Sequence, residues 1–171
     1  AVIAFGKIIG GGMPVGAYAS SSEIMSKVAP DGPVYQAGTL SGNPVAMAAG
    51  IAQLTECLRP GFYEELKEKT DYFVTAILSH SKEKGYKFNM FNVGSIFWVS
   101  FSDKKSIRRM DEIDGDGMKL FAPFHHALLE RGVYLGPSGY EVGFISAAHT
   151  MADIDFAIAA FKAALDEVFA R

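Results

Sequence analysis

The pattern of apolar and polar positions changes character near residue 60. Before that point, the short apolar runs Ala1–Phe5 and Val15–Ala19 predict strands, and we expect the first to be a buried strand of a mixed or parallel sheet. Asn43 followed by Pro44 predicts the start of a helix, with asparagine as the cap and proline at the first helical position. The alanine-rich run that continues to Leu58 is apolar on nearly every face, so we expect this helix to be buried.

Arg59, Pro60 and Gly61 interrupt the helical pattern, and the composition becomes more charged after them, so we place a domain boundary between residues 60 and 61. Thr150 with Asp153 resembles a capping arrangement at the start of a last helix. The remaining pattern predicts a helix, two strands, a helix, a strand and a helix, over residues 62–84, 87–92, 95–101, 117–131, 133–135 and 150–169. Residues 61–171 therefore predict a small α/β domain with largely antiparallel strands packed on helices.

Composition narrows the range of functions. The chain has 171 residues, 49% hydrophobic and 20% charged, which is typical of a globular protein and not of a disordered or fibrous one. A net charge of −3 without a basic cluster argues against a nucleic-acid partner. The longest uncharged stretch, residues 32–55, is interrupted by Pro44 and several polar positions, which argues against a membrane span. A single cysteine, Cys57, fits a reducing compartment, and four scattered histidines offer no metal-binding spacing.

Lys7 is the first candidate for chemistry. It lies at the predicted end of the first strand, next to Gly6 and just before the three glycines at positions 10–12, which cannot readily continue a strand or a helix. Glycines leave room for a flat ring, and a lysine that forms a Schiff base needs a partly desolvated or cation-flanked setting. The alternative from these residues alone is a solvated lysine beside a flexible glycine turn.

Three stretches of the chain carry a family resemblance. They are Gly6–Ala17, Tyr35–Pro44, and a C-terminal stretch made of Glu130–Ser138, Tyr140–Phe144 and Ala148–Thr150. Together they resemble the glutamate-1-semialdehyde 2,1-aminomutases, a family of pyridoxal-phosphate enzymes within the class-III aminotransferases. The resemblance implies an α/β fold: residues 1–60 would be the C-terminal part of a fold-type-I large domain that binds pyridoxal phosphate, and residues 61–171 the small C-terminal α/β domain. Family members are much longer, so we expect a C-terminal fragment that is inactive alone.

The same resemblance implies an activity. It is the isomerisation of glutamate-1-semialdehyde to 5-aminolevulinate, a precursor of tetrapyrroles, by intramolecular amino transfer. The cofactor would be pyridoxal 5'-phosphate, which passes through its pyridoxamine 5'-phosphate form. The resemblance also implies a cytoplasmic homodimer with a shared active site. Two rivals remain: a class-III ω-aminotransferase and, for the fragment alone, a non-catalytic structural or dimerisation module.

The resemblance also assigns roles to residues. Lys7 would form the Schiff base with the cofactor and shuttle a proton once substrate displaces it. Gly38 and Thr39 would bind the phosphate of the neighbouring subunit's cofactor, next to a helix N-terminus, a setting that attracts phosphate; otherwise Thr39 only begins a loop. Glu141 would contact the substrate's amino groups, whereas many class-III aminotransferases use an arginine for their substrate's carboxylate; otherwise it is a surface glutamate. We interpret the remaining titratable candidates as structural, namely His125, His126 and His149.

Overall fold

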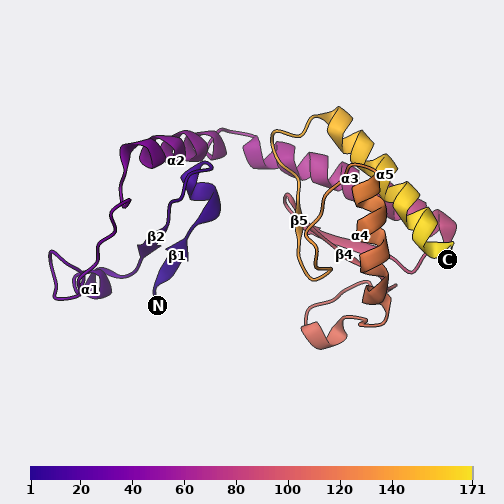
Figure 1. Cartoon of the computed structure of the whole chain (residues 1–171), viewed down its shortest axis with the longest axis horizontal. Helices are drawn as coiled ribbons and strands as arrows, with labels where there is room; N and C mark the ends of the chain where they lie inside the picture. Colours follow the sequence, from indigo (N-terminus) through magenta and orange to yellow (C-terminus); the bar gives the residue numbers. More distant parts are fainter. Residues whose placement is uncertain (171) are drawn as a thin grey trace. The chain divides into compact units, whose positions relative to one another are not determined.

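The computed structural model describes residues 1–170, which form two compact units, residues 1–62 and residues 63 onward (Figure 1). Both units contain helices and strands, so the expected mixed α/β architecture is confirmed. No helix within residues 1–170 combines the length and the apolar character that crossing a membrane requires.

The first unit begins with a two-stranded antiparallel sheet. Strand β1 (Ile3–Phe5) pairs with β2 (Ala17–Ala19), and a single 3-10 turn, η1 (Lys7–Gly10), follows β1. The predicted strand at the start of the chain is therefore confirmed. Its expected place as a buried strand of a mixed or parallel sheet is wrong, because all three residues are exposed and the pairing with β2 is antiparallel. A strand is buried only where a second layer covers it, and residues 1–62 supply no such layer over β1.

Two helices complete the first unit, the short α1 (Ser22–Met25) and α2 (Pro44–Cys57). The predicted start of α2 is confirmed, since the Asn43 Oδ1 atom accepts a hydrogen bond of 3.0 Å from the Ala46 N–H. The expected burial of this helix is wrong. Only Ala46 and Gly50 are buried, whereas Ile51 is 67% exposed, because η1 is too short to cover a helix of 14 residues.

The second unit follows the predicted order of elements. It contains helices α3 (Phe62–Lys84), α4 (Phe121–Glu130) and α5 (Met151–Phe169), 3-10 turns η2 (Met110–Glu112) and η3 (Gly117–Leu120), and strands β3 (Asn89–Val93), β4 (Ile96–Ser100) and β5 (Gly143–Phe144). The three strands form an antiparallel sheet in the order β3-β4-β5.

The predicted third strand, residues 133–135, is wrong, and β5 takes its place in the sheet. The physical reason lies in the backbone hydrogen bonds. The Val133 N–H donates to the Leu128 carbonyl (2.9 Å) and closes the end of α4, while the free edge of β4 pairs with β5 through Ile96 and Phe144. A backbone group that is used to end a helix cannot also take part in a strand ladder.

An aromatic core holds the second unit together. Phe161 of α5 meets Phe73 of α3 edge to face at 5.0 Å and Phe124 of α4 at 5.4 Å between ring centroids. The predicted capping box of α5 is confirmed, since Thr150 and Asp153 exchange hydrogen bonds between backbone and side chain. This core supports the hairpin of β3 and β4, and with it the loop that carries Glu141.

Candidate active site

Lys7 has an unusual backbone conformation. Its φ angle of +54° makes it the one residue other than glycine with a positive φ in the stretch 1–170. The left-handed region is costly for a side chain with a Cβ atom, and strain of this kind gathers at functional sites. Lys7 is exposed, and no hydrogen bond or ion pair of its side chain occurs within residues 1–170. Its side chain is therefore uncovered within residues 1–170.

Close packing of η1 on α2 fixes the position of Lys7. A Cβ atom added at Gly50 would lie 2.5 Å from the Ile9 carbonyl oxygen, and one added at Gly11 would collide with the backbone of Ala49. The two backbones approach this closely because neither glycine has a side chain. Gly50 was not among the residues that the motifs pointed to, although an isolated glycine inside an alanine-rich helix is a signal of close packing.

Gly38 and Thr39 lie in a turn that leads into α2. The Ser41 N–H donates to the Gly38 carbonyl (2.9 Å), and the Asn43 N–H donates to the Leu40 carbonyl (3.2 Å). Within residues 1–170, neither the amide groups of Gly38 and Thr39 nor the Thr39 hydroxyl makes a hydrogen bond. An exposed hydroxyl beside two free amides is a donor set that suits a phosphate group.

The turn at Thr39 and the turn at Lys7 are separate places in the first unit. η1 contacts α2 around Ala49 and Gln53, whereas the turn at Thr39 leads into the start of that helix at Asn43. Gly38 lines a cavity of about 310 Å³ beside the first turn of α2, and neither Lys7 nor Thr39 is part of its lining.

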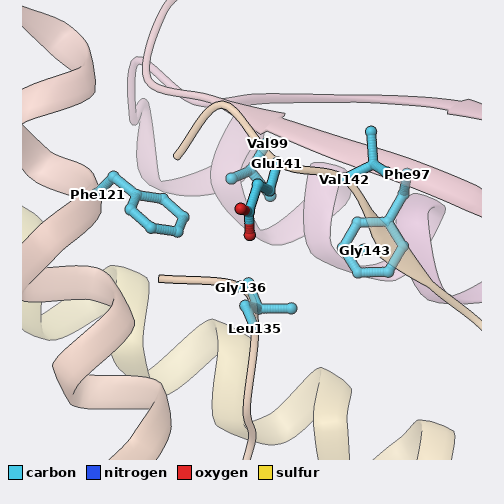
Figure 2. A pocket seen from close by; sticks show the side chains of 8 residues that line it. All are labelled: Phe97, Val99, Phe121, Leu135, Gly136, Glu141, Val142 and Gly143. Carbon is cyan, nitrogen blue, oxygen red and sulfur yellow. The ribbon is translucent and has the colours of Figure 1, made fainter. Parts of the chain in front are cut away.

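Glu141 belongs to the second unit and lies in the loop before β5. Its N–H donates to the Ser138 carbonyl (3.1 Å), and its carboxylate points toward Gly136, in the space that a side chain at position 136 would fill (Figure 2). A cavity of about 10 Å³ lies there, lined mainly by apolar side chains, namely Phe97, Val99, Phe121, Leu135 and Val142. Within residues 1–170 the carboxylate has no hydrogen-bond or ion-pair partner, so it is free to meet a cationic group.

Two histidines of the second unit, His125 and His149, contact backbone groups. The ring of His125 is buried and lies 3.1 Å from the Leu135 carbonyl through Nε2, while the Nδ1 atom of His149 accepts a hydrogen bond from the Ser146 N–H. These contacts fit a structural role. In the part of the chain that the structure describes, no cluster of three histidine, cysteine, aspartate or glutamate side chains is arranged to hold a metal ion.

Comparison with known proteins identifies the class. The class-III aminotransferase family profile matches residues 1–165, and the chain belongs to this family. A curated relative, the glutamate-1-semialdehyde 2,1-aminomutase of Leptospira biflexa serovar Patoc, is 47% identical over 167 residues, which is 97% of this chain and 39% of the relative. The chain thus spans about two fifths of the length of the curated relative that it matches.

Solved structures share the fold over nearly the whole chain. An ω-transaminase from Sphaerobacter thermophilus has a TM-score of 0.85 and 28% identity, over 98% of this chain and 39% of that one. A glutamate-1-semialdehyde aminomutase from Pseudomonas aeruginosa, solved in complex with PMP, has a TM-score of 0.75 over 98% of this chain and 39% of that one. At 20% identity, the latter similarity establishes the fold alone.

Proposed function

We propose that this chain is part of a pyridoxal-phosphate-dependent glutamate-1-semialdehyde 2,1-aminomutase, which forms 5-aminolevulinate for tetrapyrrole synthesis. The observation that carries the proposal is the left-handed Lys7, an accessible amine held in a strained turn by the packing of η1 on α2. The 47% identity to an enzyme of that name supports the substrate. The residues present fit the cofactor, since the chain offers an amine for its aldehyde and a donor set for its phosphate.

Lys7 has two tasks in this proposal. Its Nζ atom attaches the cofactor and, once the substrate's amine takes its place, carries a proton between the cofactor's C4′ carbon and the substrate carbon. Pyridoxal phosphate, when bound, supplies the electron sink that makes these proton transfers possible, and its pyridoxamine form serves as the amine donor. Lys7 is exposed within residues 1–170, so no side chain of this part of the chain covers the place where the cofactor would attach.

Gly38 and Thr39 bind the phosphate of the neighbouring subunit's cofactor in this proposal. The support is their turn, which offers an exposed hydroxyl and free amides to a phosphate group. We propose an obligate homodimer with a shared active site, in the cytoplasm, with a small molecule as substrate.

Glu141 binds the substrate's amino groups. A substrate that carries two amines during the reaction is cationic, and a carboxylate holds such a group by charge-assisted hydrogen bonds. The support is the position of the exposed Glu141 carboxylate, which lies beside apolar side chains and has no polar partner within residues 1–170. We further propose that the first unit ends the large cofactor-binding domain, and that the second unit is the small C-terminal domain that presents Glu141.

A class-III ω-aminotransferase is the second candidate, because the structure of an ω-transaminase matches this chain with a TM-score of 0.85. It differs from an aminomutase in one measurable respect, the net transfer of an amine to a keto acid. The exposed apolar side chains of α2 also suit the third interpretation, in which residues 1–171 alone form an inactive module that needs further covering surface.

The test uses the whole enzyme with three variants. Lys7→Ala and its charge-preserving control Lys7→Arg should both lose the cofactor's covalent attachment, measured by borohydride reduction and mass spectrometry. Glu141→Gln should keep the attachment and lose most of the conversion of glutamate-1-semialdehyde to 5-aminolevulinate. Transfer of the amine to a keto acid, with no 5-aminolevulinate formed, would instead establish the aminotransferase.

A further inference from the structure

A side-chain hydrogen bond from the sheet reaches the loop that carries Glu141, just before this loop enters β5. The indole Nε1–H of Trp98, in β4, donates a hydrogen bond of 2.8 Å to the carbonyl oxygen of Gly139. The other bonds of the loop are local, from the Tyr140 N–H to the Ser138 hydroxyl (3.3 Å) and from the Glu141 N–H to the Ser138 carbonyl (3.1 Å). Within residues 1–170, the long-range hydrogen bond of residues 138–141 is therefore the one from Trp98.

Trp98 is itself held in place. It lies opposite Phe91 in the antiparallel pairing of β3 and β4, and the two rings are stacked with centroids 5.9 Å apart and planes 20° from parallel. Its neighbours on β4, Phe97 and Val99, are buried on the other face of the strand. A side chain that is fixed by a cross-strand ring pair can hold a hydrogen bond in one direction at little further entropic cost.

The opposite side of Gly139 is closed as well. A Cβ atom at position 139 would lie 2.6 Å from the Met118 side chain and 2.7 Å from the ring of Phe121, so the backbone of Gly139 is packed directly on them. The Gly139 peptide is therefore held between these side chains and the Trp98 indole. Glu141 follows two residues later, and its carboxylate lies beside Gly136 (Figure 2).

We infer that Trp98 is a positioning residue for Glu141: its hydrogen bond to Gly139 sets the loop that presents the carboxylate to the substrate's amine. The inference rests on the proposed function for the role of Glu141. A carboxylate acts on a substrate only from the correct distance and direction, and small displacements of such a group are costly for turnover. Trp98 acts through Glu141 and does not itself touch the substrate.

The experiment compares two variants in the whole enzyme. Trp98→Phe keeps a ring that can stack on Phe91 and removes the indole donor, whereas the control Phe91→Leu removes the ring stacking and keeps the donor. Trp98→Phe should lower the turnover of glutamate-1-semialdehyde by about fivefold to tenfold, the factor that corresponds to one hydrogen bond between neutral groups. It should also speed deuterium exchange at the amides of Tyr140 and Glu141. Phe91→Leu loosens Trp98 but keeps the indole donor, so it should change both less than Trp98→Phe does.

A double-mutant cycle with Glu141→Gln gives the decisive readout. If Trp98 acts through Glu141, then Trp98→Phe has little further effect in the Glu141→Gln background. Independent, multiplying losses would overturn the inference, and so would equal losses in Trp98→Phe and Phe91→Leu. If the unmodified enzyme forms no 5-aminolevulinate, the proposed function fails. Deuterium exchange then still decides the inference, because an unchanged rate at Tyr140 and Glu141 in Trp98→Phe would overturn the positioning of the loop.

Discussion

The left-handed conformation of Lys7 leads to a prediction that links stability to function. Replacing Lys7 by alanine removes the amine and keeps the Cβ atom in the left-handed region, whereas replacing it by glycine removes both. A side chain with a Cβ atom costs about 1–2 kcal/mol in this region. Glycine avoids that cost but loses about 0.5–1 kcal/mol through the greater freedom of its unfolded chain. Lys7→Gly should therefore be more stable than Lys7→Ala by about 0.5–1 kcal/mol.

Chemical denaturation of the whole enzyme should show a higher midpoint for Lys7→Gly than for Lys7→Ala. Both variants are prepared without cofactor, because bound cofactor would stabilise the folded state. Both variants should fail to attach the cofactor. A higher midpoint for Lys7→Ala than for Lys7→Gly would show that position 7 is not strained and would remove the structural support for Lys7. Cofactor that stays covalently attached in either variant would show that another amine is the attachment site.

Three further predictions concern other residues of the chain. Thr39→Val should weaken cofactor binding about tenfold to a hundredfold, because one hydrogen bond to a charged phosphate is lost. In dimers of one mutant and one unmodified subunit, loss of cofactor from the mutant subunit would contradict the shared site. Gly50→Ala should lower the denaturation midpoint. Overpacking against the Ile9 carbonyl costs about 1–3 kcal/mol, which outweighs a gain of about 1 kcal/mol in helix propensity. A raised midpoint would refute the close contact between Gly50 and Ile9. The Thr150 hydroxyl, which donates to the Asp153 carboxylate, lowers the pKa of that carboxyl. The carboxylate therefore stabilises the fold at pH values above the ordinary aspartate pKa of about 3.9, and this stabilisation is lost as the pH falls through the lowered pKa. Asp153→Asn should lose less stability than the unmodified enzyme over that acid range. A parallel decline in the stability of the variant and the unmodified enzyme would exclude a contribution from the Asp153 pKa.

Several features could be predicted from local signals along the chain. The asparagine cap and proline at Asn43 and Pro44, and the capping box at Thr150 and Asp153, each depend on residues within one turn of a helix, and the structure contains both. The hairpin of β3 and β4 was predicted for the same reason, since its turn lies between neighbouring segments. The family resemblance, also local in its motifs, pointed to Lys7, Gly38, Thr39 and Glu141 as candidates for the site.

Other features depended on which segments meet in space, and only the tertiary structure decided them. Burial is one, because the apolar surfaces of β1 and α2 remain exposed where residues 1–62 provide no covering layer. The third strand is another: residues 133–135 and 143–144 both follow α4, and the segment that joined the sheet is the one whose backbone was free to pair with β4. The positive φ of Lys7, the close approach at Gly50 and the bond from Trp98 to Gly139 each join residues through backbone geometry or long-range packing. Periodicity along a chain reports which face of an element is apolar, but not what covers that face or which distant backbone it meets.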